Sequence, residues 1–215
     1  MGATLPDLGS DRFEERLRAV VEGPVVAESE LIQSLFAHYE ELRRWNPRLS
    51  LVGPGSASEV VERHYGESLA ALPLLGTKVE RLVDLGSGGG FPGLPLAAAA
   101  PGSEVWLVEP RQRKWAFLRS ATAAARLSCR CLNARVTASL PSSFPDRIDV
   151  VTIRALKLDA KTWAAIRERL SARGRVLCWS GSVPPAGLAG WRRGRQIRLP
   201  GRDRSIMEML PPDES

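Results

Sequence analysis

The spacing of apolar residues divides the chain into two parts with different periodicities. In the first part, apolar side chains recur every three or four residues, which predicts amphipathic helices. These helices are expected to begin near Ser10 or Asp11, near Ser29 and near Ser58. Gly23-Pro24 is expected to break the first helix and Asn46-Pro47 to end the second. Residues 1–75 are therefore predicted to form a helical extension.

From Val79 onward, short apolar runs alternate with helical stretches. Strands are expected at 81–85, 104–109, 128–132, 149–153, 174–179, 196–199 and 205–210, with helices at 92–100, 114–127 and 159–170. This alternation is typical of a parallel sheet covered by helices on both faces. The last two strands have no helix between them and are expected to form an antiparallel edge hairpin. The prediction is an α/β fold over 76–215, with a doubly wound, mostly parallel, seven-stranded sheet.

A glycine-rich turn joins the first predicted strand to the next helix. It contains Gly-x-Gly-x-x-Gly as Gly88, Gly90 and Gly93. Glycines there allow positive φ and let a nucleotide lie against bare backbone at a helix N-terminus. Glu109 ends the next strand, where a carboxylate can accept hydrogen bonds from both ribose hydroxyls of a nucleotide. The pattern predicts a nucleotide-cofactor site.

Asp84 bears on which nucleotide is bound, because it lies two residues before Gly86 at the end of the strand. A carboxylate there repels a pyrophosphate and attracts an ammonium group. S-adenosylmethionine carries an α-ammonium and a sulfonium and has no phosphate. The acidic strand end therefore favours S-adenosylmethionine over NAD. An NAD-type dinucleotide oxidoreductase remains an alternative.

Charge is distributed unevenly along the chain. Residues 1–110 contain 9 Lys+Arg and 16 Asp+Glu, a net charge of −7, whereas residues 111–215 contain 21 and 8, a net charge of +13. This segregation indicates a polyanionic partner such as nucleic acid. A C-terminal arginine cluster beside Trp191 is expected either to contact phosphates or to form a solvated basic face: Arg192, Arg193, Arg195, Arg198, Arg202 and Arg204.

Other features narrow the class of protein. The N-terminus does not resemble a signal peptide, and the longest apolar run, Leu94–Ala100, is too short to cross a bilayer. We therefore expect a cytoplasmic protein without a membrane partner. The three cysteines, Cys129, Cys131 and Cys178, fall inside predicted strands and lack the second pair of a zinc site. No metal site and no thiolate nucleophile are expected.

The sequence also limits which kind of atom could accept a methyl group. Methylation at pyrimidine C5 needs a thiolate, and methylation of an exocyclic amine usually shows a polar-Pro-Pro-aromatic loop. That loop is replaced here by Val151–Ala155. A ring nitrogen such as guanine N7 has a lone pair in its neutral form and needs no base. Catalysis would then rest mainly on alignment with the methyl group.

The segment Asp84–Leu96 resembles the signature of the glucose-inhibited division protein B family, the bacterial small-subunit (16S) ribosomal RNA guanine-N7 methyltransferases. Further matches are Trp45-Asn46, Arg63-His64, Ser68, Glu109, Lys114, Phe117–Arg119, Arg135-Val136, Arg154-Ala155 and Arg204. The resemblance implies a Rossmann-like class I methyltransferase that uses S-adenosyl-L-methionine. It also implies that the partner is ribosomal RNA or the small ribosomal subunit. We expect a monomer.

By position, the resemblance implies cofactor contacts at Gly86, Phe91, Val136, Thr137 and Arg154. The glycine-rich motif itself adds Asp84, Ser87, Gly88, Gly90 and Glu109. Arg154, at the carboxyl end of a parallel strand, and His64 are the expected catalytic residues. Several polar positions depart from the family pattern: Ser50, Val52, Glu67, Thr137 and Ser180. A degenerate relative that binds cofactor or RNA without this activity is therefore a further alternative.

Overall fold

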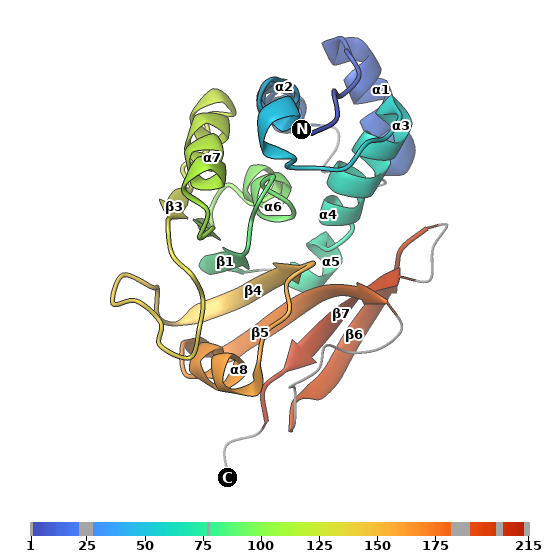
Figure 1. Ribbon diagram of the computed structural model, residues 1–215. Coiled ribbons are helices and arrows are strands. Elements are labelled where there is room, and N and C mark those ends of the chain that lie inside the picture. Colours follow the sequence, from blue (N-terminus) through green and yellow to red (C-terminus); the bar gives the residue numbers. More distant parts are fainter. Residues whose placement is uncertain (1, 22–27, 77, 182–189, 201–203, 213–215) are drawn as a thin grey trace.

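Figure 1 shows the computed structural model, which describes residues 2–21, 28–76, 78–181, 190–200 and 204–212. The helical segments before the sheet are α1 (Ser10–Val20), α2 (Ser29–Leu49), α3 (Ala57–Val60), the π-helix η2 (Val61–Gly66), α4 (Glu67–Leu69) and α5 (Leu72–Leu75). The strands are β1 (Arg81–Leu85), β2 (Glu104–Val108), β3 (Arg130–Leu132), β4 (Ile148–Arg154), β5 (Leu170–Gly181), β6 (Arg192–Arg198) and β7 (Arg204–Leu210). The helices between them are α6 (Gly93–Ala99), α7 (Gln112–Ala124) and α8 (Ala160–Arg167). The predicted break at Gly23-Pro24 lies outside the described residues.

The described strands form one seven-stranded sheet in the order β3-β2-β1-β4-β5-β7-β6. The pairs among β1 to β5 are parallel, whereas β7 is antiparallel to both β5 and β6. The helices α6 and α7 lie with the N-terminal helices on one side of the sheet, and α8 lies on the other (Figure 1). The predicted α/β architecture is confirmed, including the antiparallel hairpin at one edge.

Two hydrophobic clusters cover the two faces of the sheet. In β4, Val150 packs in the cluster with the N-terminal helices, while Val151 and Ile153 pack in the cluster with α8. This alternation follows the period of two along a strand. Because both faces are buried, apolar residues predominate in the central strands, with Asp84 of β1 and Thr152 of β4 as buried polar exceptions.

The N-terminal helices share the first cluster with α6 and α7. Phe13 of α1 packs edge-on against Tyr65 of η2, with ring centroids 5.2 Å apart, and also contacts Tyr39 of α2. The Tyr39 hydroxyl donates to the carbonyl of Pro6 at 2.6 Å. These contacts hold the N-terminal helices to one another, and the shared cluster packs them with α6 and α7.

The end of α2 differs from the prediction, because the helix continues through Pro47 to Leu49. Proline removes only one hydrogen bond in this last turn, and Ser50 then ends the helix in the left-handed conformation (φ 48°). The buried Asn46 side chain secures the turn, donating to the Ala3 carbonyl at 2.7 Å and accepting from the Val52 amide at 2.9 Å.

The third predicted helix is interrupted by a π-helical turn. It begins at Ala57, next to the expected start at Ser58, and Ser56 is its N-cap. Ser56 and Glu59 accept from each other's backbone amides at 3.3 and 2.7 Å. The chain then widens into η2, which carries His64 and Tyr65. Such turns are frequent at functional sites.

Candidate active site

The glycine-rich turn after β1 has the backbone geometry that its sequence predicts. Gly86, Gly88 and Gly90 have φ values of 72°, 51° and 87°, a region that side chains disfavour. The Gly86 and Ser87 amides both donate to the Val108 carbonyl, at 2.8 and 3.1 Å, and so tie the loop to the end of β2. The loop is held open at the carboxyl ends of β1 and β2.

A cleft of about 480 Å³ lies beside this loop. Its lining includes seven predicted site residues: His64, Gly86, Ser87, Gly88, Phe91, Glu109 and Arg154. The remaining four do not line it in the described part of the chain. Asp84 and Gly90 lie next to the loop, Val136 packs against the cluster of α8, and Thr137 is exposed. Cofactor contacts at Val136 and Thr137 stay predictions.

Glu109 follows β2 and is only 5% exposed. Its Oε2 accepts from the Gly88 amide at 3.0 Å, and its Oε1 accepts from the Arg111 amide at 2.9 Å. Asn133 secures the backbone here by donating to the Glu109 carbonyl at 2.8 Å. A carboxylate has about four acceptor positions, so two remain for ligand hydroxyls. The carboxylate is thus held in place at the cleft with acceptor capacity to spare.

Asp84 is buried beneath the loop rather than exposed to the cleft. Its Oδ1 accepts from the Thr152 hydroxyl at 2.8 Å, whereas its Oδ2 has no partner among the described residues. Burial raises the pKa of Asp84 to about 6, against the lowering effect of the Thr152 hydrogen bond. A Cβ on Gly93 would lie 2.8 Å from Oδ2, so only glycine lets α6 begin this close to the carboxylate.

His64 forms one wall of the cleft together with Phe91. Their ring centroids are 4.9 Å apart, with an angle of 31° between the planes. Burial, reinforced by the charges of Arg154 and Arg63, lowers the pKa of His64 to about 3. The imidazole is therefore neutral near pH 7.

His38 of α2 supports the glycine loop from behind, a role that the sequence prediction missed. It is fully buried, and its Nε2 lies 3.0 Å from the Gly89 carbonyl, so this nitrogen must be the donor. Nδ1 then accepts from the Tyr65 hydroxyl at 3.1 Å. Burial lowers the pKa of His38 to about 4. The one signal in the sequence is that His38 falls on the apolar stripe of α2.

Arg154 ends β4, as predicted, and its side chain is 14% exposed. Its Nη2 donates to the Arg63 carbonyl at 2.6 Å and to Glu67 Oε2 at 2.9 Å. Its Nη1 is buried and has no partner among the described residues. The guanidinium is thus anchored through Nη2, whereas Nη1 is left without a hydrogen-bond partner in the described part of the chain.

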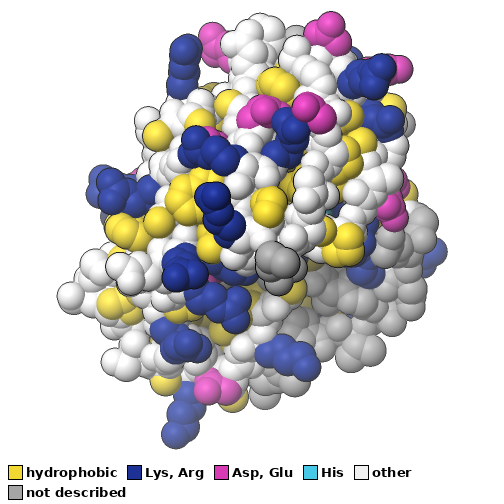
Figure 2. Space-filling model, turned by 45° about the horizontal axis from the view of Figure 1, so that its top comes forward, with side chains coloured by type: hydrophobic (Ala, Val, Ile, Leu, Met, Phe, Trp, Pro, Cys, Tyr) yellow, Lys and Arg dark blue, Asp and Glu magenta, His cyan; other side chains and the backbone are white. Residues whose placement is uncertain are grey.

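Further cations surround the cleft. Arg111, Lys114 and Arg135 join Arg154 in its lining, where Glu109 is the carboxylate. We call Arg111, Lys114 and Arg135 the basic rim. Figure 2 shows Lys and Arg side chains in a band down one face of the molecule, with few Asp or Glu among them. A site with this excess of positive charge suits a ligand that carries several negative charges.

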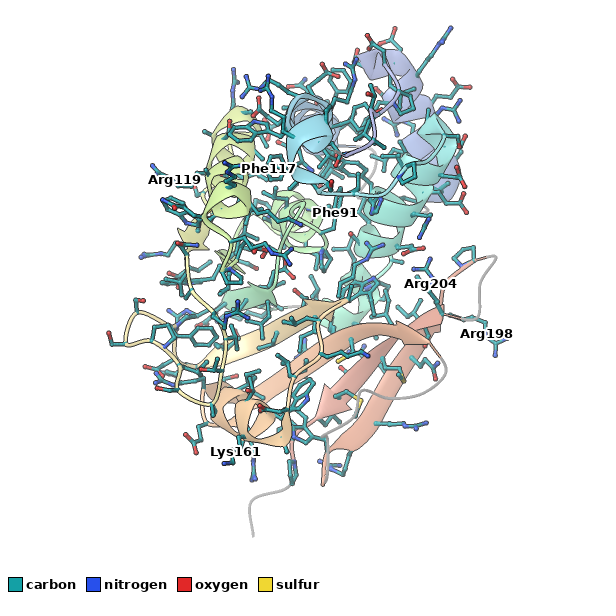
Figure 3. All side chains as sticks on the ribbon, in the orientation of Figure 1. Phe91, Phe117, Arg119, Lys161, Arg198 and Arg204 are labelled. Atoms are coloured by element: carbon teal, nitrogen blue, oxygen red, sulfur yellow. The ribbon has the colours of Figure 1, made fainter. Side chains whose placement is uncertain are left out.

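Some members of the predicted C-terminal arginine cluster pair with buried carboxylates. Arg195, although its side chain is 56% exposed, donates to Glu208, and Arg204 pairs with Glu67. Arg193 and Arg198 are exposed, and Arg202 lies outside the described residues. Arg198 and Arg204 lie at the same end of the β6–β7 hairpin (Figure 3).

The cysteines form no disulfide and, among the described residues, belong to no cluster that could hold a metal ion. All three cysteines are free, and Cys129 lies just before β3 rather than inside a strand. Burial raises the pKa values of Cys129 and Cys178 to about 12, so both are thiols. The described residues contain no group of three or more His, Cys, Asp or Glu that could hold a metal ion. No described helix is both long enough and apolar enough to span a membrane.

Comparison with known proteins identifies the family of the chain. The sequence model of the family described as rRNA small subunit methyltransferase G matches residues 31–193. The ribosomal RNA small subunit methyltransferase G of Myxococcus xanthus is 35% identical over 192 residues, covering 87% of this chain and 88% of that protein. The protein of the same name from Cupriavidus pinatubonensis is 32% identical over 193 residues, covering 80% and 81%.

Solved structures support the fold alone. An S-adenosylmethionine-dependent methyltransferase from Aquifex aeolicus superimposes with a TM-score of 0.57 at 16% identity, covering 71% of this chain and 93% of that one. The mitomycin 7-O-methyltransferase MmcR gives 0.55 at 17% identity, covering 97% and 74%. Sequence, fold and cleft agree, and they set aside the dinucleotide oxidoreductase: the chain belongs to the rRNA small subunit methyltransferase G family of S-adenosylmethionine-dependent enzymes.

Proposed function

We propose that this protein, acting as a monomer in the cytoplasm, transfers a methyl group from S-adenosylmethionine to N7 of a guanine in small-subunit ribosomal RNA. The observation that carries the proposal is the composition of the cleft. A glycine loop and a fixed glutamate, suited to a nucleoside, meet the basic rim, suited to phosphates. The names of the relatives supply the class of RNA.

The residues present fit S-adenosylmethionine. Gly86 and Gly88 offer bare backbone, and Glu109 retains acceptor positions for the ribose hydroxyls. Arg154 has a buried donor nitrogen without a partner among the described residues. When bound, the cofactor supplies an electrophilic methyl group on a sulfonium. The chain's own contribution is to hold that group still and to exclude water around it.

Guanine N7 is the acceptor that this cleft suits best. His64, with a pKa of about 3, is too weak a base to remove a proton near pH 7, and the thiols of Cys129 and Cys178 are fully protonated there. N7 needs neither a base nor a nucleophile, because its lone pair is free in neutral guanine. The rate enhancement then comes from aligning N7 with the methyl group.

The shape of RNA sets a further condition on the target. N7 lies on the major-groove edge of guanine, which A-form RNA holds in a groove too deep and narrow for protein side chains. The target guanine therefore lies in a loop, a bulge or a remodelled site, and turns outward into the cleft. The basic rim holds the phosphates on either side.

Borohydride–aniline treatment tests the proposal, because it cleaves RNA at N7-methylguanine. Small-subunit RNA incubated with the enzyme and S-adenosylmethionine should be cleaved at one position, and RNA incubated without the cofactor should not. Absence of cleavage, together with intact binding of S-adenosylhomocysteine, would instead support the degenerate relative. The binding measurement separates a lost activity from a lost cofactor site.

A further inference from the structure

A buried glutamate joins three elements of the fold next to the cleft. Glu67 of α4 is 6% exposed, and its two carboxylate oxygens are shared between two arginines. Oε2 accepts from Arg154 of β4 at 2.9 Å, and Oε1 accepts from Arg204 of β7. The Glu67 carbonyl accepts from the indole Nε1 of Trp179 in β5 at 3.0 Å. The carboxylate is therefore fixed from several directions.

This bridge leaves Arg154 with an unused donor. The Nη2 atom makes both hydrogen bonds of the guanidinium, to Glu67 and to the Arg63 carbonyl. The Nη1 atom is buried and unpartnered among the described residues, although Arg154 lines the cleft. An unsatisfied buried donor is costly and uncommon in native proteins. Asp84 also interacts with Arg154 by charge, but no hydrogen bond joins the two side chains. A ligand atom in the cleft is therefore a candidate partner for Nη1.

The position of Arg154 indicates which part of a ligand it meets. Glu109 follows β2 and Arg154 ends β4, and β1 with its glycine loop lies between these two strands. Two strand spacings separate their ends, about 10 Å. A cofactor whose ribose lies at Glu109 and which crosses the glycine loop brings its methionyl end to Arg154. The carboxylate there is the anionic group of S-adenosylmethionine, and a guanidinium is its best partner.

We propose that Glu67 is a positioning residue for cofactor binding: held by Arg204, it fixes Nη2 of Arg154 so that Nη1 faces the carboxylate of S-adenosylmethionine. The inference rests on the proposed function for its choice of cofactor. It assigns to Glu67 and Arg204 a role that neither can exert by touching the ligand. The C-terminal strand β7 thereby contributes to cofactor binding through a chain of two side chains.

The experiment compares two ligands that share the adenosine and the thioether. S-adenosylhomocysteine also carries the amino-acid group with its carboxylate and ammonium, whereas 5′-methylthioadenosine carries neither charge. Glu67→Gln should lower the affinity for S-adenosylhomocysteine about 10- to 100-fold. This is the size expected when a charged hydrogen bond is misplaced. Its affinity for 5′-methylthioadenosine should stay within about 2-fold, because that ligand has nothing to offer Nη1. Arg204→Gln should show the same selective loss to a smaller degree.

Glu208→Gln is the matched control. Glu208 of β7 is also buried between two arginines, 3.4 Å from Arg175 and 3.0 Å from Arg195, but it does not line the cleft in the described part of the chain. Its substitution removes the same kind of bridge and should leave the affinity for both ligands unchanged.

The ratio of the two affinities decides the outcome, because it does not depend on the fraction of folded protein. An equal loss for both ligands in Glu67→Gln, or no loss for either, overturns the positioning role. Selective loss in Glu208→Gln overturns it as well. If the wild-type protein fails to bind S-adenosylhomocysteine, the proposed function fails first, so the two failures are distinguishable.

Discussion

At the scale of single residues, hydrogen bonds fix both carboxylate oxygens of Glu109. Its carboxylate accepts from the amides of Gly88 and Arg111, so it both shapes the glycine loop and presents acceptors to the cleft. Glu109→Ala removes both contributions. We expect the affinity for S-adenosylhomocysteine to fall by about 1.5–3 kcal/mol, measured by isothermal titration calorimetry.

Glu104 provides the control for that prediction. It opens the strand that Glu109 follows, and pairs there with Arg81 and Arg130, each at 2.7 Å, at the opposite edge of the sheet from the cleft. Glu104→Ala changes the net charge by the same amount as Glu109→Ala. It should leave the affinity for the cofactor unchanged. Equal losses in the two variants would mean that Glu109 acts through general stability rather than as an acceptor for ribose.

The site residues were predictable to different degrees. Gly86, Gly88 and Glu109 follow from the strand–turn–helix pattern, because the backbone itself requires glycine and a strand end there. The contribution of His38 was not predictable, since a histidine on an apolar stripe gives no sign of the carbonyl it will meet. Glu67 was seen only as a departure from a family pattern, because its arginine partners lie far away in sequence.

At the scale of elements, α2 couples the helical extension to the glycine loop through His38. Burial lowers the pKa of His38 to about 4, so between that value and 6.5 the unfolded chain binds this proton more readily than the folded chain. Its contribution to stability is complete above pH 6.5 and is lost as pH falls through 4. About 3 kcal/mol of the free energy of unfolding is at stake.

His38→Gln tests this coupling, because glutamine can still donate to the Gly89 carbonyl but does not titrate. Urea unfolding is measured at about pH 7.0, 5.5 and 4.5. As the pH falls, the free energy of unfolding should decrease more steeply in the wild type than in the variant. Asp84, whose raised pKa of about 6 acts in the opposite direction, is present in both proteins and cancels in the comparison. Parallel curves would contradict the coupling.

The predictability of the elements follows their burial. β1, β2 and β4 were placed within a residue or two, because both of their faces are largely buried and each contains a short run of mostly apolar residues. β6 was predicted at 196–199 but spans Arg192–Arg198, since an exposed edge strand rich in arginine has no hydrophobic alternation. The π-helical turn η2 has no signal in the spacing of apolar residues and was read as ordinary helix.

At the scale of the whole molecule, the uneven charge predicted a polyanionic partner, and the structure divides the cations into two groups. Arg195 and Arg204 are committed to buried carboxylates and hold the fold together. The basic rim instead lines the cleft without a comparable number of carboxylates. A count of charges along the sequence could not make this distinction, because it depends on partners from distant strands.

Salt dependence measures which of these cations meet phosphates. Each phosphate contact releases counterions, so the slope of log affinity against log salt reports how many contacts form. In the double variant Lys114→Gln/Arg135→Gln, two members of the basic rim lose their charge. The slope for small-subunit RNA should become shallower by about 1–2, measured by filter binding over a series of salt concentrations.

Arg167→Gln/Arg173→Gln is the matched control, because Arg167 ends α8 and Arg173 lies near the start of β5, both at the amino ends of the strands. The net charge changes by the same amount, while the cleft at the carboxyl ends is untouched. An equal change of slope in both variants would mean that RNA responds to net charge alone, and the basic rim would then have no specific part in holding the target.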